Sequence, residues 1–420
     1  MRNVKVANRG WGNAAGLVVA ISGLVWACQG GSVVRVDILS GDDQTAQAGT
    51  VLPAPVRFRV VDDQGGGVSG VFVHVLTIGD AGRIMRSETG VPLTDFVDTT
   101  DALGEGEFFW SLGALLGEQL ASATVVDDQQ LPIEGIRSVL ITAIAGLGPP
   151  NIVLPVNGHL GSAEVGTDAD PLVVAVFDSL ANPISGVDVS WAVTAGGGSI
   201  SDMISTTDLM GLATTTLTVG PTVVDNLVAA TVADRPPVEF SVIGVNPIAD
   251  PVGDQVPGEG GVPPDLIAYQ GFVIDGMVVF HMRFNQTANS SAVGGSNTVR
   301  GFIEIDIDQD PNTGNIPIID VRPDGTTTGM GIEYRIIIQL QNGRHQVSVL
   351  PSGSTVFRAA AAFSGRTITI RVPLSAFGGD DGNMNYGILV GTFKSGELSI
   401  LGQTAPTDWA PESGWATIIP

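Results

Sequence analysis

The residues of this chain best suited to chemistry are a run of oxygen-bearing side chains in its last third. Asp306, Asp308, Asp310 and Asn312 recur at every second position and lead into a Thr-Gly turn. Oxygen ligands of this kind select calcium over zinc. Residues i and i+2 of a strand lie about 6.6 Å apart, so one ion would need the turn to curl Asp308, Asp310 and Asn312 around it. The sequence therefore predicts either a calcium site or an acidic, solvated hairpin end.

The strand that leads into this run carries its acidic residues on one face. Over residues 301–308 the isoleucines alternate with Glu and Asp, so the two kinds of side chain point to opposite sides. The acids must be offset by solvent, by Arg300 or Arg335, or by a cation. An EF-hand is excluded, because its sixth loop position would be Pro311 instead of Gly and its twelfth would be Pro317 instead of Glu.

Three aromatic residues near the C-terminus are candidate ligand-binding residues. Tyr386, Trp409 and Trp415 carry ring faces on which a sugar could stack. Packing in the core is the alternative role, and it is the one we favour for each ring.

Motifs of common enzyme classes are missing from the sequence. The four histidines are scattered and form no HExxH, and there is no GxSxG elbow and no GxxxxGK[ST] loop. Acidic pairs are abundant, so counting alone does not exclude a glycosidase dyad. Aromatic residues make up only 6% of the chain, too few to line a deep cleft. We expect a protein that is not an enzyme and that has no cofactor besides calcium.

The N-terminus has the pattern of an export signal, predicted over residues 1–27 with a tether over 28–33. It opens with basic residues and no acid, and residues 14–27 carry no charge, a stretch too short to cross a membrane. Cys28, the one cysteine, follows directly. This arrangement resembles a bacterial lipoprotein signal and implies a membrane anchor through lipidated Cys28, although Trp26 stands where that family prefers a small residue. The alternative is ordinary secretion after Ala27.

Composition predicts an exported, acidic, all-β protein. Fifty-six glycines and 25 prolines interrupt short runs rich in Val, Ile and Thr, and no segment after the signal has a capped helical stripe. The net charge of −24 is spread along the chain. Nucleic acid is therefore not an expected partner, because its binding needs clustered Lys and Arg.

Two consecutive stretches of the chain repeat one pattern. Residues 55–75 match 171–191, and the TTDALG of residues 99–104 matches the TTDLMG of 206–211. The Asp and Gly residues are typical of turns, and the alternating apolar residues between them are typical of half-buried strands. Tandem β-sandwiches are predicted, with an extra surface loop, RIMRSETGVPLTD, in the first copy.

These repeats resemble bacterial immunoglobulin-like (Ig-like) domains of the invasin and intimin type. The resemblance rests on VRFRVVDDQGGGVSGVFVHV with TTDALGEGEFFW, and on VVAVFDSLANPISGVDVSWAVTAGGGSIS with TTDLMGLATTTLTVG. It implies one Ig-like domain over residues 34–146 and a second over 150–245. In adhesins of that family such repeats mostly act as stalks, with recognition at the distal tip.

A Pro- and Gly-rich linker is predicted over residues 246–264, and a larger β-sandwich or jelly-roll over 265–420. This last region loosely resembles DOMON-type and carbohydrate-binding β-sandwiches in IDIDQDPNTG, GIEYRI, ITIRVPLSAFG and DWAPESGW. The resemblance implies a ligand on a sheet face or in a loop cleft.

Three functions are compatible with this organisation. The first is an Ig-like stalk in the bacterial cell envelope, as an outer-membrane lipoprotein or at the cell surface, that presents the C-terminal domain to a surface protein or glycan. The second is a carbohydrate-binding module on an Ig-like spacer, which an open groove beside Trp409 or Trp415 would favour. The third is a purely structural envelope protein, which a sealed aromatic core and an exposed strand edge would favour.

Overall fold

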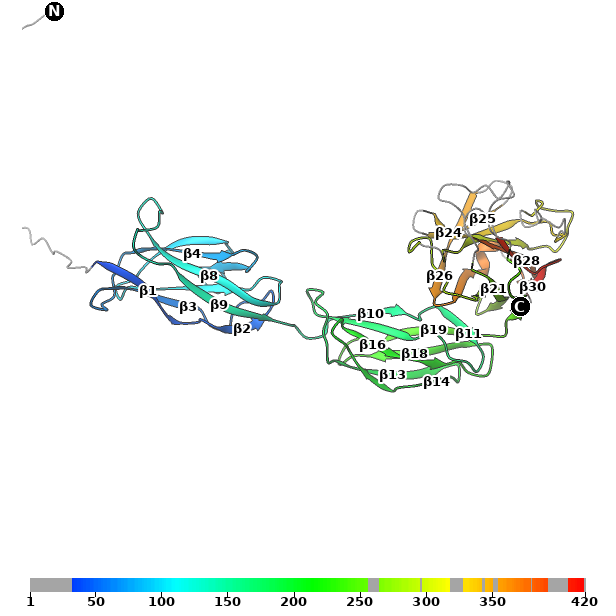
Figure 1. Ribbon diagram of the computed structural model, residues 1–420, viewed down its shortest axis with the longest axis horizontal. Coiled ribbons are helices and arrows are strands. Elements are labelled where there is room, and N and C mark those ends of the chain that lie inside the picture. Colours follow the sequence, from blue (N-terminus) through cyan, green and yellow to red (C-terminus); the bar gives the residue numbers. More distant parts are fainter. Residues whose placement is uncertain are drawn as a thin grey trace, which may run out of the picture. The chain divides into compact units, whose positions relative to one another are not determined.

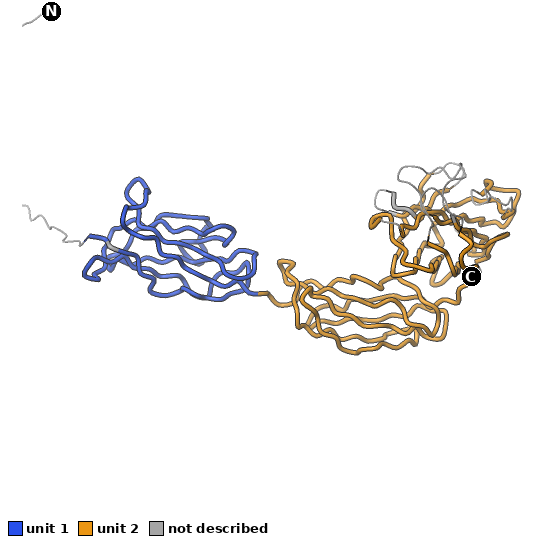
Figure 2. The backbone as a smooth tube through the Cα atoms, viewed as in Figure 1, with its two compact units in different colours: residues 1–146 blue, residues 147–420 orange. Residues whose placement is uncertain are grey.

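A computed structural model describes most of the chain after the predicted signal (Figure 1). The described residues are 32–255, 264–294, 297–317, 328–341, 344–349, 354–378, 380–391 and 407–418. Cys28 and the predicted signal peptide lie outside them. The chain forms two compact units, residues 1–146 and 147–420 (Figure 2).

The expected all-β fold is confirmed. Strands make up the regular structure of the described residues, apart from the 3-10 turn η2 (Leu374–Phe377). Within this part of the chain, no helix has the length and apolar character needed to cross a membrane.

The first unit is a sandwich of two sheets. Its strands are β1 (Val33–Ser40), β2 (Gln44–Gln47), β3 (Val56–Asp62), β4 (Phe72–Ile78), β5 (Arg83–Met85), β6 (Asp95–Thr99), β7 (Glu105–Ser111), β8 (Gly117–Val126) and β9 (Val139–Gly146). One sheet has the order β1-β3-β7-β5 and the other β2-β9-β8-β4-β6. β2 runs parallel to β9, whereas β1 pairs with β3 in the opposite sheet. The loop predicted as an insertion supplies β5, at the edge of the first sheet.

The second unit begins with a sandwich of the same design. Its strands are β10 (Ile152–Asn157), β11 (Gly161–Glu164), β12 (Leu172–Phe177), β13 (Asp188–Ala195), β14 (Ser199–Ile200), β15 (Ile204–Thr206), β16 (Leu212–Thr215), β17 (Leu217–Thr218), β18 (Asp225–Thr231) and β19 (Val238–Val245). The two main sheets are β10-β12-β16 and β11-β19-β18-β13-β15, and β14 pairs with β17. β11 runs parallel to β19, as β2 does to β9. The repeat in the sequence is therefore a repeat of the fold.

Matched aspartates form the same turns in both sandwiches. Asp62 accepts hydrogen bonds from the backbone N–H groups two and four residues further on, at 3.0 and 2.7 Å, and Asp178 does so at 2.9 Å each. Asp101 and Asp208, in the repeated TTD motif, make the same two bonds at 2.8–2.9 Å. A carboxylate that satisfies two turn amides fixes the turn, which explains why these positions match.

The threonine before each of the latter aspartates joins two loop segments. The Thr207 hydroxyl accepts the Val187 N–H at 2.9 Å and donates to the Ile184 carbonyl at 2.7 Å. Thr100 makes the corresponding pair of bonds in the first unit, at 2.9 and 2.8 Å. Both side chains are buried, so no solvent replaces these bonds if the hydroxyl is lost.

The last domain is one sheet of eleven strands that folds into two layers. Its strands are β20 (Ile248–Ala249), β21 (Leu266–Ile274), β22 (Met277–Phe284), β23 (Arg300–Asp306), β24 (Tyr334–Gln341), β25 (Arg344–Val349), β26 (Ser354–Ser364), β27 (Thr367–Pro373), β28 (Met384–Gly391), β29 (Thr407–Ala410) and β30 (Ala416–Ile418). The first half of β26 pairs with β25 and the second half with β27. β26 thus passes from one layer to the other, and the layers enclose a single apolar core. This is the expected larger β-sandwich.

The first part of the predicted linker belongs to this sheet. β20 pairs with β21, and the Asp250 N–H donates to the Ile267 carbonyl at 3.0 Å. Residues 256–263 lie outside the described part of the chain. The proline-rich composition concealed this pairing, because a two-residue strand has no periodicity to detect.

Replacing Thr207 with Val is expected to destabilise the second unit by about 1–3 kcal/mol, because it leaves the partly buried Val187 N–H without an acceptor. Urea unfolding of residues 147–420 measures the change. The control is Thr214→Val on the exposed face of β16, expected within about 0.5 kcal/mol of the wild type. Equal losses in both variants would contradict this role for Thr207.

Candidate functional site

The predicted calcium loop does gather carboxylates, but with a partner from the next strand. β23 ends at Asp306, and the turn that follows lets Asp306, Asp308 and Glu333 each bring one oxygen within 4.8 Å of the others. Glu333 immediately precedes β24, which pairs with β23. It stood within the GIEYRI segment of the sequence, but only the strand register shows which residue faces the loop.

The other two predicted ligands do not join this group. The Asp310 carboxylate accepts hydrogen bonds from the backbone and side-chain N–H groups of Asn312, at 2.9 and 2.8 Å. The Thr313 hydroxyl instead bonds the Asp308 carboxylate at 2.9 Å. The structure thus brings together Asp306 and Asp308, and leaves Asp310 and Asn312 bonded to each other in the exposed turn.

Burial makes Asp306 and Glu333 costly to ionise. Asp306 is only 1% exposed, and burial followed by the charge of Asp308 raises its pKa, against the lowering effect of hydrogen bonds from Asn385 and Gln309. Burial is also the main cause that raises the pKa of Glu333. Arg335, expected as one source of neutralising charge, bonds Glu304 through Nε at 2.9 Å.

The three aromatic candidates occupy different environments. Tyr386 is fully buried in the core, and its hydroxyl accepts the Gly271 N–H at 2.8 Å. Trp409 packs against Phe302 and Leu389 in a small apolar cluster. Trp415 is the exposed one of the three, at 47%. Two of the rings therefore have the core role that we favoured.

Sequence reasoning missed a buried junction between the second Ig-like domain and the C-terminal domain. β22 reads MVVFHMRF, and its Val278, Phe280 and Met282 enter the core of the last domain. The alternate side chains of this strand point away from that core. Among them, Val279 packs with Phe272 of β21 and Val245 of β19. Both faces of β22 carry buried apolar residues, so its pattern differs from the strict alternation of a half-exposed strand.

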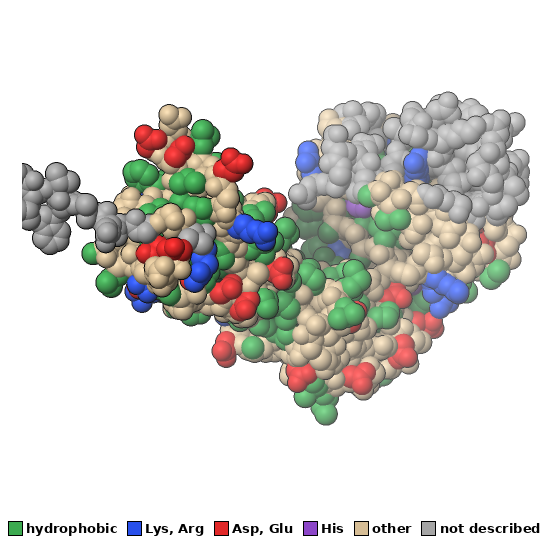
Figure 3. All heavy atoms as spheres, turned by 60° about the vertical axis from the view of Figure 1, so that its left-hand side comes forward, with side chains coloured by type: hydrophobic (Ala, Val, Ile, Leu, Met, Phe, Trp, Pro, Cys, Tyr) green, Lys and Arg blue, Asp and Glu red, His purple; other side chains and the backbone are tan. Residues whose placement is uncertain are grey.

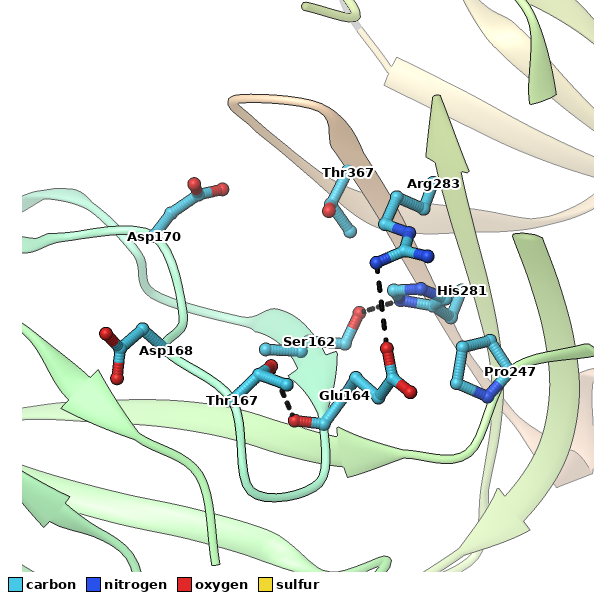
Figure 4. A pocket seen from close by; sticks show the side chains of 10 residues that line it. Ser162, Glu164, Thr167, Asp168, Asp170, Pro247, His281, Arg283 and Thr367 are labelled. Atoms are coloured by element: carbon cyan, nitrogen blue, oxygen red, sulfur yellow. Dashed lines mark hydrogen bonds and ion pairs between the residues drawn. The ribbon is translucent and has the colours of Figure 1, made fainter. Parts of the chain in front are cut away.

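Polar groups complete the junction. Ser162 of β11 shares a hydrogen bond with His281 Nδ1 at 2.7 Å (Figure 4). It shares a second one with the Thr369 hydroxyl at 2.5 Å. Arg371 of β27 donates to the Ser241 hydroxyl at 2.8 Å and to the Gly161 carbonyl at 3.1 Å. These bonds join residues more than 100 positions apart in the sequence and hold the two domains in one orientation relative to each other.

A polar hollow of about 90 Å³ opens beside this junction. Figure 4 shows Asp168, Asp170 and Glu164 on the Ig-like side and Arg283 and Thr367 on the other. Glu164 and Arg283 form an ion pair at 3.6 Å across it. The volume suits a few waters, and is well below the ~300 Å³ at which small-molecule pockets begin.

The Ser162–His281 contact has the atoms of a nucleophile and a base but not their environment. Burial lowers the pKa of His281 to about 3, and its Nε2 atom is buried without a hydrogen-bond partner among the described residues. A catalytic triad needs a carboxylate that orients the imidazole, and a base with a pKa near the working pH. The pair is therefore a structural contact.

Acid is expected to weaken the second unit through His281. The imidazole titrates near 6.5 when unfolded and near 3 when folded, so the stability present above pH 6.5 is lost as the pH falls towards 3. From pH 6.5 to 4.5, His281→Gln should reduce the loss of unfolding free energy by about 2–3 kcal/mol relative to the wild type. Chemical denaturation of the whole protein across this range, followed through the transition of the second unit, measures it.

The matched control for this experiment is the same substitution in the first unit. His74→Gln in the whole protein leaves the second unit unchanged, so its pH dependence should equal that of the wild type. A His281→Gln variant with an unchanged pH dependence would contradict the assignment.

No protein-family model and no curated protein matches this chain. Among solved structures it is similar to the D00-D0 domain of intimin, with 16% identity and a TM-score of 0.29 over 50% of this chain and 99% of that one. It is also similar to the Escherichia coli adhesin FdeC (12% identity, TM-score 0.31, 92% and 96% covered) and to a β-glycosidase from Bacteroides vulgatus (10%, 0.21, 50% and 24%).

The solved structures thus include intimin, the type of domain that the repeats in the sequence resemble. All these TM-scores lie below 0.5. The likeness is one of fold, and it carries no conclusion about a ligand or an activity.

Proposed function

We propose that this protein is anchored in the bacterial cell envelope and uses its Ig-like domains to hold the C-terminal β-sandwich at the cell surface for adhesion or ligand binding. The observation that carries the proposal is the buried junction of the second unit. A flexible tether would let the last domain tumble freely. Here the domain is fastened to its neighbour by apolar packing and by the bonds of His281 and Arg371.

The junction is well suited to hold a domain in a fixed orientation. Its apolar part consists of Ile243 and Val245 from β19 with Phe272 and Val279 from the last domain, and all four side chains are buried. Each such side chain contributes about 1.5–3 kcal/mol when it is removed from water. The Arg371 bonds add direction, because a guanidinium presents its donors in a fixed plane.

The surface charge narrows the class of partner. On the face drawn in Figure 3, acidic side chains are dispersed among apolar and uncharged ones, and no broad basic patch is visible on the described residues there. A net charge of −24 repels nucleic acid and anionic headgroups. A surface protein or an uncharged glycan is therefore the partner that we propose, with Trp415 as an accessible aromatic side chain.

Replacing Cys28 with Ser tests the anchor and the function together. Lipidation needs the thiol, so the wild-type protein should fractionate with membranes and the variant should be released. Bacteria that express the wild type should adhere to a glycoprotein-coated surface, and cells with the variant should adhere as weakly as cells without the protein. Ser32→Ala, within the same predicted tether, is the matched control and should behave as the wild type.

Two results would contradict the proposal. Membrane retention of the Cys28→Ser variant would exclude a lipid anchor at this residue. Equal adherence of cells with and without the wild-type protein would exclude adhesion to that surface.

We also propose that Asp306, Asp308 and Glu333 bind calcium and thereby order the loop that follows β23. Three carboxylate oxygens within 4.8 Å fit around one ion with ligand distances of about 2.3–2.6 Å. Calcium would also neutralise buried charge for which Arg335 is not available, because that arginine bonds Glu304.

Calcium at about 100 times its Kd should raise the unfolding free energy by about 2.7 kcal/mol, since it binds the folded state alone. The double substitution Asp308→Asn, Glu333→Gln should remove the part of this rise that is due to calcium bound at this site. Asp310→Asn, outside the group, is the control and should retain it. Thermal melting with calcium and with chelator measures the effect, and an unchanged rise in the double variant would contradict the site.

A further inference from the structure

A second acidic group lies where the start and the end of the last domain meet. Asp250 directly follows β20, Asp254 lies four residues later, Asp408 belongs to β29, and Glu412 follows that strand. One carboxylate oxygen from each lies within 4.8 Å of all the others. No local pattern pointed to this group, because Asp250 and Asp408 are 158 positions apart in the sequence.

The beginning of β21 holds the two halves of this group together. The Asp250 N–H donates to the Ile267 carbonyl at 3.0 Å. On the other side, the neighbouring Leu266 N–H donates to Asp408 Oδ2 at 2.7 Å. The arrangement is thus built from backbone pairing of the sheet rather than from mobile surface side chains.

Several of these oxygens are buried without a hydrogen bond. Asp250 is only 6% exposed, and its Oδ2 atom has no partner among the described residues. Both carboxylate oxygens of Asp254 are likewise buried and without a partner there. Native proteins rarely leave buried polar atoms unpaired, and each exception calls for an explanation such as an ion.

The charged groups that act most strongly on this group are further acids. Burial, and then the charges of Asp408, Asp254, Glu412 and Asp265, raise the pKa of Asp250 to about 8. Burial is also the main cause that raises the pKa of Asp408 to about 8. No cation is among the causes that act on Asp250 and Asp408, so the acidic neighbours of these two residues disfavour their ionised forms.

We propose that Asp250, Asp254, Asp408 and Glu412 form a calcium site that fastens the segment after β20 to β29. Two oxygens bound to one calcium ion lie at most about 5 Å apart, twice the ligand distance of 2.3–2.6 Å, and the four oxygens meet this limit. The ligands are carboxylates alone, whereas zinc prefers nitrogen and sulfur, and magnesium keeps several waters. The site is independent of the Asp306 group and of the proposed function.

The test measures calcium binding to the purified protein by isothermal titration, in a background that lacks the other group. The Asp308→Asn, Glu333→Gln protein should still bind one calcium ion, with a Kd at or below the ~10⁻³ M of extracellular calcium modules. Adding Asp254→Asn and Glu412→Gln should abolish this binding. These two residues are less buried than Asp250 and Asp408, so their substitution disturbs the fold least.

Melting temperatures separate loss of the ion from loss of the fold. In chelator, the variant with Asp254→Asn and Glu412→Gln should melt at or above the temperature of its parent, because two repelling charges have been removed. In calcium the parent should rise and the variant should not. Asp128→Asn in an exposed turn of the first unit is the matched control and should leave both temperatures unchanged.

Two outcomes would overturn the site. One is absence of calcium binding in the Asp308→Asn, Glu333→Gln protein up to 10⁻² M, which is about tenfold above the weakest expected Kd. That result would mean that protons neutralise these acids. The other is calcium binding that persists after Asp254→Asn and Glu412→Gln, which would place the ion elsewhere.

Discussion

Burial of β22 on both faces is the constraint on which the second unit depends. One face supplies Phe280 and Met282 to the core of the last domain, while the other places Val279 and His281 against the second Ig-like domain. Period-two alternation makes these two roles inseparable, since a shift of one residue would exchange the faces. His281 must then remain neutral, and the Ser162 and Thr369 hydroxyls must satisfy a polar contact that water does not reach. The junction therefore restricts which side chains β11, β22 and β27 can carry where these three strands meet.

The same sheet accounts for the acidic groups. Pairing of β23 with β24 brings Glu333 to Asp306, and the start of β21 brings Asp250 to Asp408. In both places carboxylates lie close together with at least one of them buried, and two arginines of the domain are engaged elsewhere, Arg335 with Glu304 and Arg371 with Ser241. An exported protein meets millimolar calcium more often than a cytoplasmic one. Under the two calcium proposals, these acidic groups would stabilise the fold only outside the cell, which is consistent with the predicted export signal at the N-terminus.

Local patterns predicted most of the fold, and long-range contacts explain what they missed. The repeated Asp and Thr residues identified both Ig-like sandwiches because each acts within its own turn or between neighbouring loops, as Asp178 and Thr207 show. The strand before the acidic loop was also recognisable from its alternating isoleucines. Glu333, the pairing of β20 and the Ser162–His281 contact were not, because each depends on a strand register between distant segments. Composition was misleading once, when prolines around β20 indicated a linker where the chain begins a sheet.

Scanning calorimetry of the whole protein in calcium tests most directly whether residues 147–420 unfold as one body. We expect two transitions. The one for the second unit should have a calorimetric enthalpy of about 190 kcal/mol near 60 °C, equal to its van't Hoff enthalpy, as expected for cooperative unfolding of some 270 residues. Three transitions, with the second Ig-like domain melting apart from the last domain, would show that the junction does not couple them and would contradict the account.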